Sequence, residues 1–177
     1  MGPFDCAAET LPACRAVLQR LTEDDFARAT PCTEYTVGDV GQHVVRSMVL
    51  LAAVAGEQID TPVAGTLEEN VAATAEAALA AWRRHGLDGS VAVGRSVMPA
   101  DLAAEIIPLE LLVHGWDIAQ ATGQSIDASP EVASYLLARA RELITQDKRG
   151  RSFATQVPVR PEATALRRLI AFTGRPP

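Results

Sequence analysis

Residues 106–119, IIPLELLVHGWDIA, form an almost wholly apolar run interrupted by Glu110, His114 and one aspartate. Glu110 and His114 are four residues apart, so in an α-helix they lie on the same face. That face also carries apolar residues: Ala103, Ile106, Ile107, Ile118 and Ala121. A polar group left unpaired in a core-facing stripe costs roughly 2–7 kcal/mol, and a charge costs more. We therefore expect this pair to be satisfied either by hydrogen-bonded partners or by a metal ion.

The composition predicts one compact, all-α domain. The chain has 177 residues and is 48% hydrophobic, which is enough for a single core of ordinary size. Alanine is abundant and aromatic residues make up only 5%, a balance that favours helices over strands. The formal net charge is −6 and no long basic stretch is present, so we expect no nucleic-acid partner.

The cysteines and the N-terminal sequence bear on location. Cys6, Cys14 and Cys32 are too few for a disulfide framework, and no Cys-x-x-Cys pair occurs. Reduced thiols are typical of the cytoplasm. The first residues lack a basic region followed by a long apolar segment, and nowhere do 18 uncharged apolar residues run together. We expect a cytoplasmic protein that does not associate with membranes.

Hydrophobic spacing and capping patterns predict five long helices. Thr36 with Asp39, and Thr66 with Glu69, form capping-box patterns that open the second and third of them. Pro108 should kink the fourth helix, because proline removes a backbone donor and crowds the preceding turn. The expected bounds are about Phe4 or Leu11 to Leu21, Val37 to Gly56, Thr66 to Arg84, Pro99 to Thr122, and Ser129 to Lys148.

The segments between and after these helices complete the expected organisation. Residues 57–65 form a polar connector long enough to cross a helical bundle. Gly89 to Met98 is short, Val-rich and roughly alternating, which indicates a small hairpin or extended excursion. A last short helix should end at Gly174. We expect one domain, with a metal-binding bundle over residues 1–150 and a tail over 151–177 that packs on it.

His43, on the helix that follows Thr36, supplies a third candidate ligand. Two imidazoles and a carboxylate, with a fourth position left open, are the usual set for a catalytic zinc ion, whereas structural zinc sites close their shell with four protein ligands. Zinc is therefore the expected metal, with nickel as a replacement acquired in handling. Asp39 and Asp117 are spaced to accept a ring N–H from His43 and His114, respectively.

Two stretches of the chain resemble a known family. Residues 30–43, TPCTEYTVGDVGQH, look like the TPCxxWTVxDLxxH segment of the actinobacterial branch of DinB/YfiT-like proteins. Residues 110–117, ELLVHGWD, look like their ElvvHgWDlA signature. This branch includes the N-terminal domain of mycothiol-dependent maleylpyruvate isomerase. Tyr35 stands where the family pattern commonly has Trp, and the tail is too short to form the second domain of that isomerase.

The resemblance implies a fold and a site. The implied fold is a four-helix bundle of the DinB/YfiT type with a long crossover, to which this chain adds the hairpin-like excursion and the C-terminal helix. The implied metal ligands are the residues that match the family pattern, His43, Glu110 and His114. The resemblance also implies a low-molecular-weight thiol such as mycothiol as cofactor or co-substrate, with a small electrophile as the second substrate.

Three functions stay open at the level of the sequence. The first is a metal-dependent transferase or isomerase in which a bound thiol attacks an electrophilic carbon. The second is a non-catalytic module that binds a metal or a small ligand, and the third is a metal-dependent hydrolase. Cys32 is expected to be structural, with a nucleophilic role as the alternative. The apolar face of the tail helix leads us to expect a homodimer.

Overall fold

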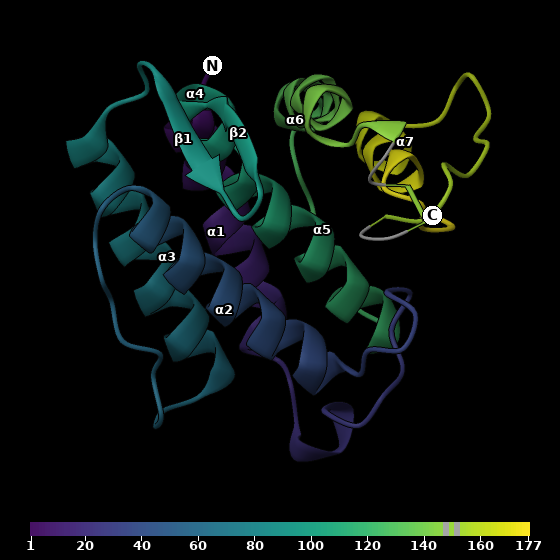
Figure 1. Cartoon of the computed structure of the whole chain (residues 1–177). Helices are drawn as coiled ribbons and strands as arrows, with labels where there is room; N and C mark the ends of the chain where they lie inside the picture. Colours follow the sequence, from purple (N-terminus) through teal and green to yellow (C-terminus); the bar gives the residue numbers. More distant parts are fainter. Residues whose placement is uncertain (147–148, 151–152) are drawn as a thin grey trace.

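A computed structural model describes residues 1–146, 149–150 and 153–177 of the chain (Figure 1). The long helices are α1 (Pro3–Leu18), α2 (Val37–Val54), α3 (Leu67–His85) and α5 (Ile106–Ala121). Helices α1 and α2 each pack against both α3 and α5, so the four enclose a common core. The shorter elements are η1 (Glu23–Asp25), β1 (Ser90–Val93), β2 (Ser96–Pro99), α4 (Ala100–Ala104), α6 (Pro130–Leu143) and α7 (Ala165–Phe172). The protein is thus mostly helical with one small sheet, rather than strictly all-α as expected.

The predicted starts of α2 and α3 are confirmed. The Thr36 hydroxyl accepts a hydrogen bond from the Asp39 backbone N–H at 3.2 Å, and the Asp39 carboxylate accepts one from the Thr36 N–H at 2.9 Å. Thr66 and Glu69 form the same reciprocal pair at the start of α3. These caps satisfy backbone donors that the first helical turn leaves without partners. They fix where α2 begins, and thereby where His43 lies along it.

The predicted helix from Pro99 to Thr122 is divided into α4 and α5, and the break lies at Glu105 rather than at Pro108. Proline cannot donate to the carbonyl four residues earlier, and its ring crowds that carbonyl. The helix therefore ends before Glu105 and restarts, with Pro108 in the first turn of α5, where the donor is not needed. Glu110 and His114 consequently lie in one uninterrupted helix.

Two helix ends differ from the predictions by three residues or more. α1 ends at Leu18 rather than Leu21, and α6 ends at Leu143. The predicted end of the fifth helix, Lys148, lies outside the described residues, as does Arg151, the first residue of the predicted tail. The start of α6 is confirmed: Pro130 is its first residue, and the Ser129 hydroxyl accepts from the Val132 backbone N–H.

The excursion after α3 is an antiparallel hairpin, as predicted, with Ser90 opposite Pro99 and Val93 opposite Ser96. At the other end of the chain, α7 packs against α6 (Figure 1). Gly174 follows α7 with a φ of +93°, and a Cβ there would lie 2.7 Å from the Ala154 Cβ. Only glycine fits both the backbone angle and this close approach. The tail therefore turns sharply after α7.

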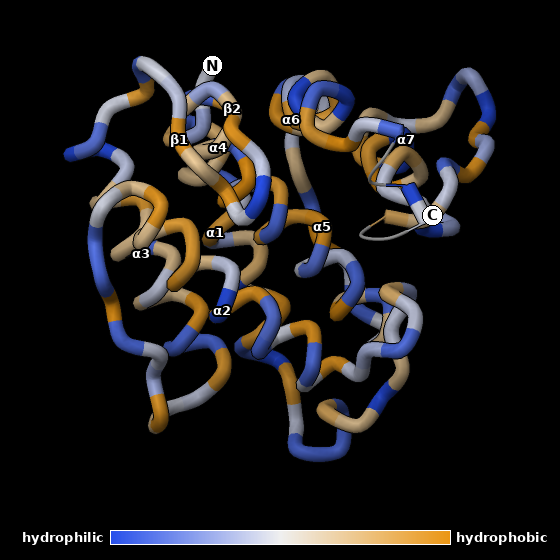
Figure 2. The backbone as a smooth tube through the Cα atoms, viewed as in Figure 1, coloured by the Kyte–Doolittle hydropathy of each residue, from blue (hydrophilic) through white to orange (hydrophobic). Residues whose placement is uncertain are grey.

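The core lies between the long helices. In Figure 2, hydrophobic and polar segments alternate along α2 and α3, as expected for helices with one buried face. α2 is also the one helix of the described chain that is long and apolar enough to cross a membrane. Its packing against α3 and α5 and its buried face of Val40, Val44, Met48 and Leu51 are those of a core helix.

Candidate metal centre

The packing of α2 against α5 brings the three predicted ligands together. His43 Nε2 lies 3.0 Å from Glu110 Oε2, and His114 Nε2 lies 3.7 Å from the same oxygen. One potential ligand atom from each residue lies within 4.8 Å of those of the other two. His114 is buried, and His43 and Glu110 are partly exposed. The sequence spacing placed Glu110 and His114 on one face, and the fold adds His43 from the neighbouring helix.

The Glu110 carboxylate faces both imidazoles at distances that suit a shared cation. Its Oε2 atom is buried and has no hydrogen-bond partner in the described part of the chain, although both imidazoles approach it. Zinc bonds of about 2.0–2.1 Å at tetrahedral angles place ligand atoms about 3.3 Å apart. The observed separations of 3.0 and 3.7 Å bracket that value. The residues present therefore offer donor types that suit a divalent cation, and the two imidazoles lie at distances from the carboxylate oxygen close to those of tetrahedral ligands.

The charges of Glu110 and His43 affect each other's pKa values, and the charge of His114 also affects that of Glu110. Burial favours the neutral form of Glu110, but the positive charges of His114 and His43 outweigh it and lower the pKa of this carboxyl to about 2. The contact with Glu110, against the effect of burial, raises the pKa of His43 above its ordinary value. Glu110 is therefore anionic at neutral pH, and this charge is available to a bound cation.

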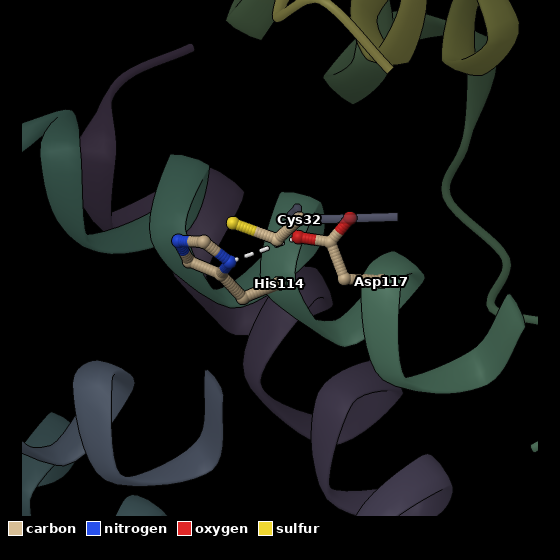
Figure 3. A group of neighbouring side chains, drawn as sticks. All are labelled: Cys32, His114 and Asp117. Carbon is tan, nitrogen blue, oxygen red and sulfur yellow. Dashed lines mark hydrogen bonds and ion pairs between the residues drawn. The ribbon is translucent and has the colours of Figure 1, made fainter. Parts of the chain in front are cut away.

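Asp117 fixes the orientation of His114. Its Oδ2 lies 3.0 Å from His114 Nδ1, and Asp117 is fully buried (Figure 3). A carboxylate only accepts hydrogen bonds, so Nδ1 carries a proton, and in the neutral imidazole Nε2 then keeps its lone pair. In Figure 3 the second ring nitrogen points away from Asp117. This is the geometry of a metal-binding histidine held by a carboxylate.

Asp39 forms the expected cap of α2, but its carboxylate makes no hydrogen bond with His43 among the residues that the structure describes. Its Oδ2 accepts hydrogen bonds from the Thr36 backbone N–H and hydroxyl, at 2.9 and 2.6 Å. These bonds lower the pKa of Asp39, with the hydroxyl bond as the larger cause. The polar contacts of His43 within the described residues are with Ser47, at 3.4 Å, and Glu110. Asp39 therefore serves the cap of α2, and the orienting role predicted for it at His43 has no support in these contacts.

Arg175 is a residue of the site that the sequence did not reveal. Its Nε lies 2.7 Å from Asp117 Oδ1 and its Nη2 lies 2.8 Å from Oδ2. Both side chains are buried. Arg175 follows the short tail helix and is 58 residues from Asp117 in sequence. Only the run Gly174-Arg175-Pro176 marks the position, and such a run is typical of an ordinary loop.

Cys32 also lies at the site. Its thiol is next to the His114 ring (Figure 3), and Cys32, His114 and Asp117 form a second group of potential ligand atoms within 4.8 Å. Both oxygens of Asp117 already bind the Arg175 guanidinium. The protein itself therefore supplies the positive charge that pairs with Asp117 in this second group. Burial raises the pKa of the Cys32 thiol, against the lowering effect of Arg175. Cys32 therefore lacks the low pKa of a nucleophilic cysteine.

A cavity of about 480 Å³ opens on the three candidate ligands. This volume suits a small molecule. Its lining is mixed in character and consists of Cys32, Tyr35, Val40, His43, Glu110, His114, Phe153 and Arg175. An ion held by the two histidines and the glutamate would therefore have one side open to a ligand, unlike a closed structural site.

Comparisons with known proteins agree with the two motifs. Residues 7–119 match the family described as the mycothiol maleylpyruvate isomerase N-terminal domain. Two uncharacterized proteins of Mycobacterium tuberculosis, Rv0738 of strain H37Rv and MT0763 of strain CDC 1551, are each 31% identical over 179 residues. The alignments cover 99% of this chain and 98% of each relative. No solved structure matches the chain. The chain thus belongs to the mycothiol maleylpyruvate isomerase N-terminal domain family, as its two motifs indicated.

Proposed function

We propose that this protein binds one zinc ion through His43, Glu110 and His114 and acts as a transferase or isomerase that uses a low-molecular-weight thiol such as mycothiol. The observation that carries the metal assignment is the buried Glu110 Oε2, which faces two imidazole Nε2 atoms and lacks a hydrogen-bond partner in the described chain. The family supports the choice of thiol.

Each residue has a defined part in this proposal. His114 offers the Nε2 lone pair that its hydrogen bond to Asp117 leaves free. Glu110 contributes the single negative charge, so the site as a whole remains cationic. Zinc bound there would supply Lewis acidity that lowers the pKa of a thiol at its open position from about 8.5 toward neutrality. Tyr35 and Phe153 line the cavity beside the ligands, where they can exclude water from an electrophilic substrate.

We also propose the type of helical bundle, the domain to which the tail belongs, the location of the protein and its assembly. The four long helices, with the connector of residues 57–65, are assigned to a DinB-type four-helix bundle with a long crossover. The tail from residue 151 is assigned to the same domain, because Leu169 and Ile170 of α7 are fully buried. The free cysteines support a cytoplasmic location. A homodimer through the tail is the proposed assembly, and light scattering at micromolar concentration tests it.

Metal content tests the site directly. Protein prepared without chelator or nickel resin should contain close to one zinc per chain by elemental analysis, and His43→Ala/His114→Ala should contain almost none. His85→Ala is the matched control, because His85 is exposed at the end of α3 and should leave the metal content unchanged. Equal zinc in the double variant and the wild type would refute the assignment.

Activity separates the catalytic proposal from its alternatives. The assay is conjugation of mycothiol to a bimane electrophile, with wild type, Glu110→Gln and Cys32→Ser compared at equal protein concentration. We expect Cys32→Ser to retain most turnover and Glu110→Gln to lose it together with zinc. Activity that survives in Glu110→Gln and vanishes in Cys32→Ser would indicate a protein-cysteine mechanism. Zinc binding without turnover in the wild type would favour a binding module.

A further inference from the structure

We infer that Arg175 is a positioning residue that couples docking of the C-terminal tail to the metal affinity of the site. The inference rests on the proposed metal function. It starts from an unbroken chain of contacts that runs from Arg175 through Asp117 to His114, which lies beside Glu110. The tail residues that form it lie beyond the segment that matches the family, residues 7–119.

The ion pair between Arg175 and Asp117 is bidentate and buried. Two guanidinium nitrogens of Arg175 bind the two oxygens of Asp117 at 2.7 and 2.8 Å, a bidentate arrangement that fixes the plane of the carboxylate. The side chain of Asp117 is 0% exposed and that of Arg175 is 9% exposed. Oδ2 of Asp117 also accepts the ring N–H of His114. The guanidinium therefore decides where the oxygen that orients His114 can lie.

The backbone that leads to Arg175 is held in place by hydrogen bonds to α7. The Arg175 N–H donates to the Ile170 carbonyl at 3.3 Å, and the preceding Gly174 has a φ of +93° at a position where a Cβ would lie 2.7 Å from the Ala154 Cβ. The extended segment before α7 is tied to that helix by the Val157 N–H, which donates to the Ala171 carbonyl. Undocking of this tail would withdraw Arg175 from Asp117.

Withdrawal of Arg175 would change the metal ligand through Asp117. The carboxylate would become a buried, unpaired charge that is free to rotate or to draw in water, and His114 would lose its fixed orientation. Loss of such an outer partner lowers metal affinity by about 10–100-fold in other metal sites. Linkage requires the converse as well: if the docked tail tightens metal binding, bound metal stabilises the docked tail by the same factor.

The first test measures zinc affinity by competition with a chromophoric chelator. Arg175→Met should bind zinc about 10–100-fold more weakly than the wild type. Arg167→Met is the matched control, because Arg167 is an exposed arginine of the same tail that donates to the Pro177 carbonyl, and its affinity should change less than about 2-fold. Wild-type affinity in Arg175→Met would overturn the inference.

A second variant separates positioning from mere support of the fold. Asp117→Asn/Arg175→Met leaves no buried charge, and the Asn carbonyl can still accept the His114 N–H. Its stability without metal should recover toward that of the wild type, while its zinc affinity stays about 10-fold lower, because a neutral carbonyl is the weaker partner. Recovery of both quantities would show a structural role alone and overturn the inference.

The reciprocal effect gives a readout other than affinity. In the wild type, zinc should slow amide hydrogen exchange in residues 165–175 by the same factor by which Arg175→Met weakens binding, and in Arg175→Met it should have no effect there. If the wild type bound zinc but zinc did not slow amide exchange in residues 165–175, the coupling would be refuted and the proposed metal site would stand. A wild type that binds no zinc would refute both.

Discussion

Breaking the Asp117–Arg175 pair in the metal-free protein should produce one of the largest losses of stability available to a single substitution. Arg175→Met removes the only cation that binds both oxygens of Asp117 among the described residues and leaves that carboxylate fully buried. Removal of one partner of a buried pair costs about 3–5 kcal/mol, because the other charge remains uncompensated. In a chain of this length, that corresponds to a fall in Tm of roughly 6–20 °C.

Urea denaturation followed by far-ultraviolet circular dichroism measures this loss, with chelator present so that metal does not contribute. Arg167→Met should lie within about 0.5 kcal/mol of the wild type, because it is an exposed surface substitution. Asp117→Asn/Arg175→Met should recover most of the stability lost in Arg175→Met. A loss below about 1 kcal/mol in Arg175→Met would mean that water or another donor reaches Asp117, and the argument from burial would fail.

Three further outcomes are expected. In the metal-free protein, NMR titration of His43 should give a pKa above its ordinary value of 6.5, and Glu110→Gln should lower it. The protonated form of His43 then adds stability below pH 6.5 that is lost as the pH rises through the raised pKa, whereas zinc affinity falls as the pH falls through it. Thr36→Ala should cost about 1 kcal/mol of unfolding free energy by removing the α2 cap. Gly174→Ala should weaken zinc binding measured by chelator competition, because a Cβ at φ +93° would push against Ala154 and move the tail.

Local rules predicted the parts of the fold and the site that depend on neighbours in sequence. The Thr-x-x-Asp and Thr-x-x-Glu pairs located the starts of α2 and α3, because a cap is a contact between residues three positions apart. The spacing of four between Glu110 and His114 placed both on one face of α5. His43 could be suggested as a partner, but its distance from Glu110 depends on how α2 and α5 pack.

Contacts between distant residues were the ones that the sequence could not supply. The pairing of Arg175 with Asp117 joins α5 to a tail segment whose path depends on α6 and α7. Cys32 reaches the site from a loop, and loops carry no periodicity from which a contact follows. The spacing of Asp39 was compatible with two roles, capping α2 through Thr36 and orienting His43. The structure shows the cap. Pro108 signalled a break, but steric crowding of the preceding carbonyl moved that break to Glu105.

The position of Arg175 along the chain also sets an order of events during synthesis. All three candidate ligands have been translated by residue 114, and Arg175 follows 61 residues later. At translation rates of about 5–20 residues per second, this separation corresponds to roughly 3–12 s. For that interval the nascent protein holds the complete ligand set without the guanidinium that fixes Asp117. The contacts that fix Asp117, and through it His114, can therefore form only after the tail has been translated.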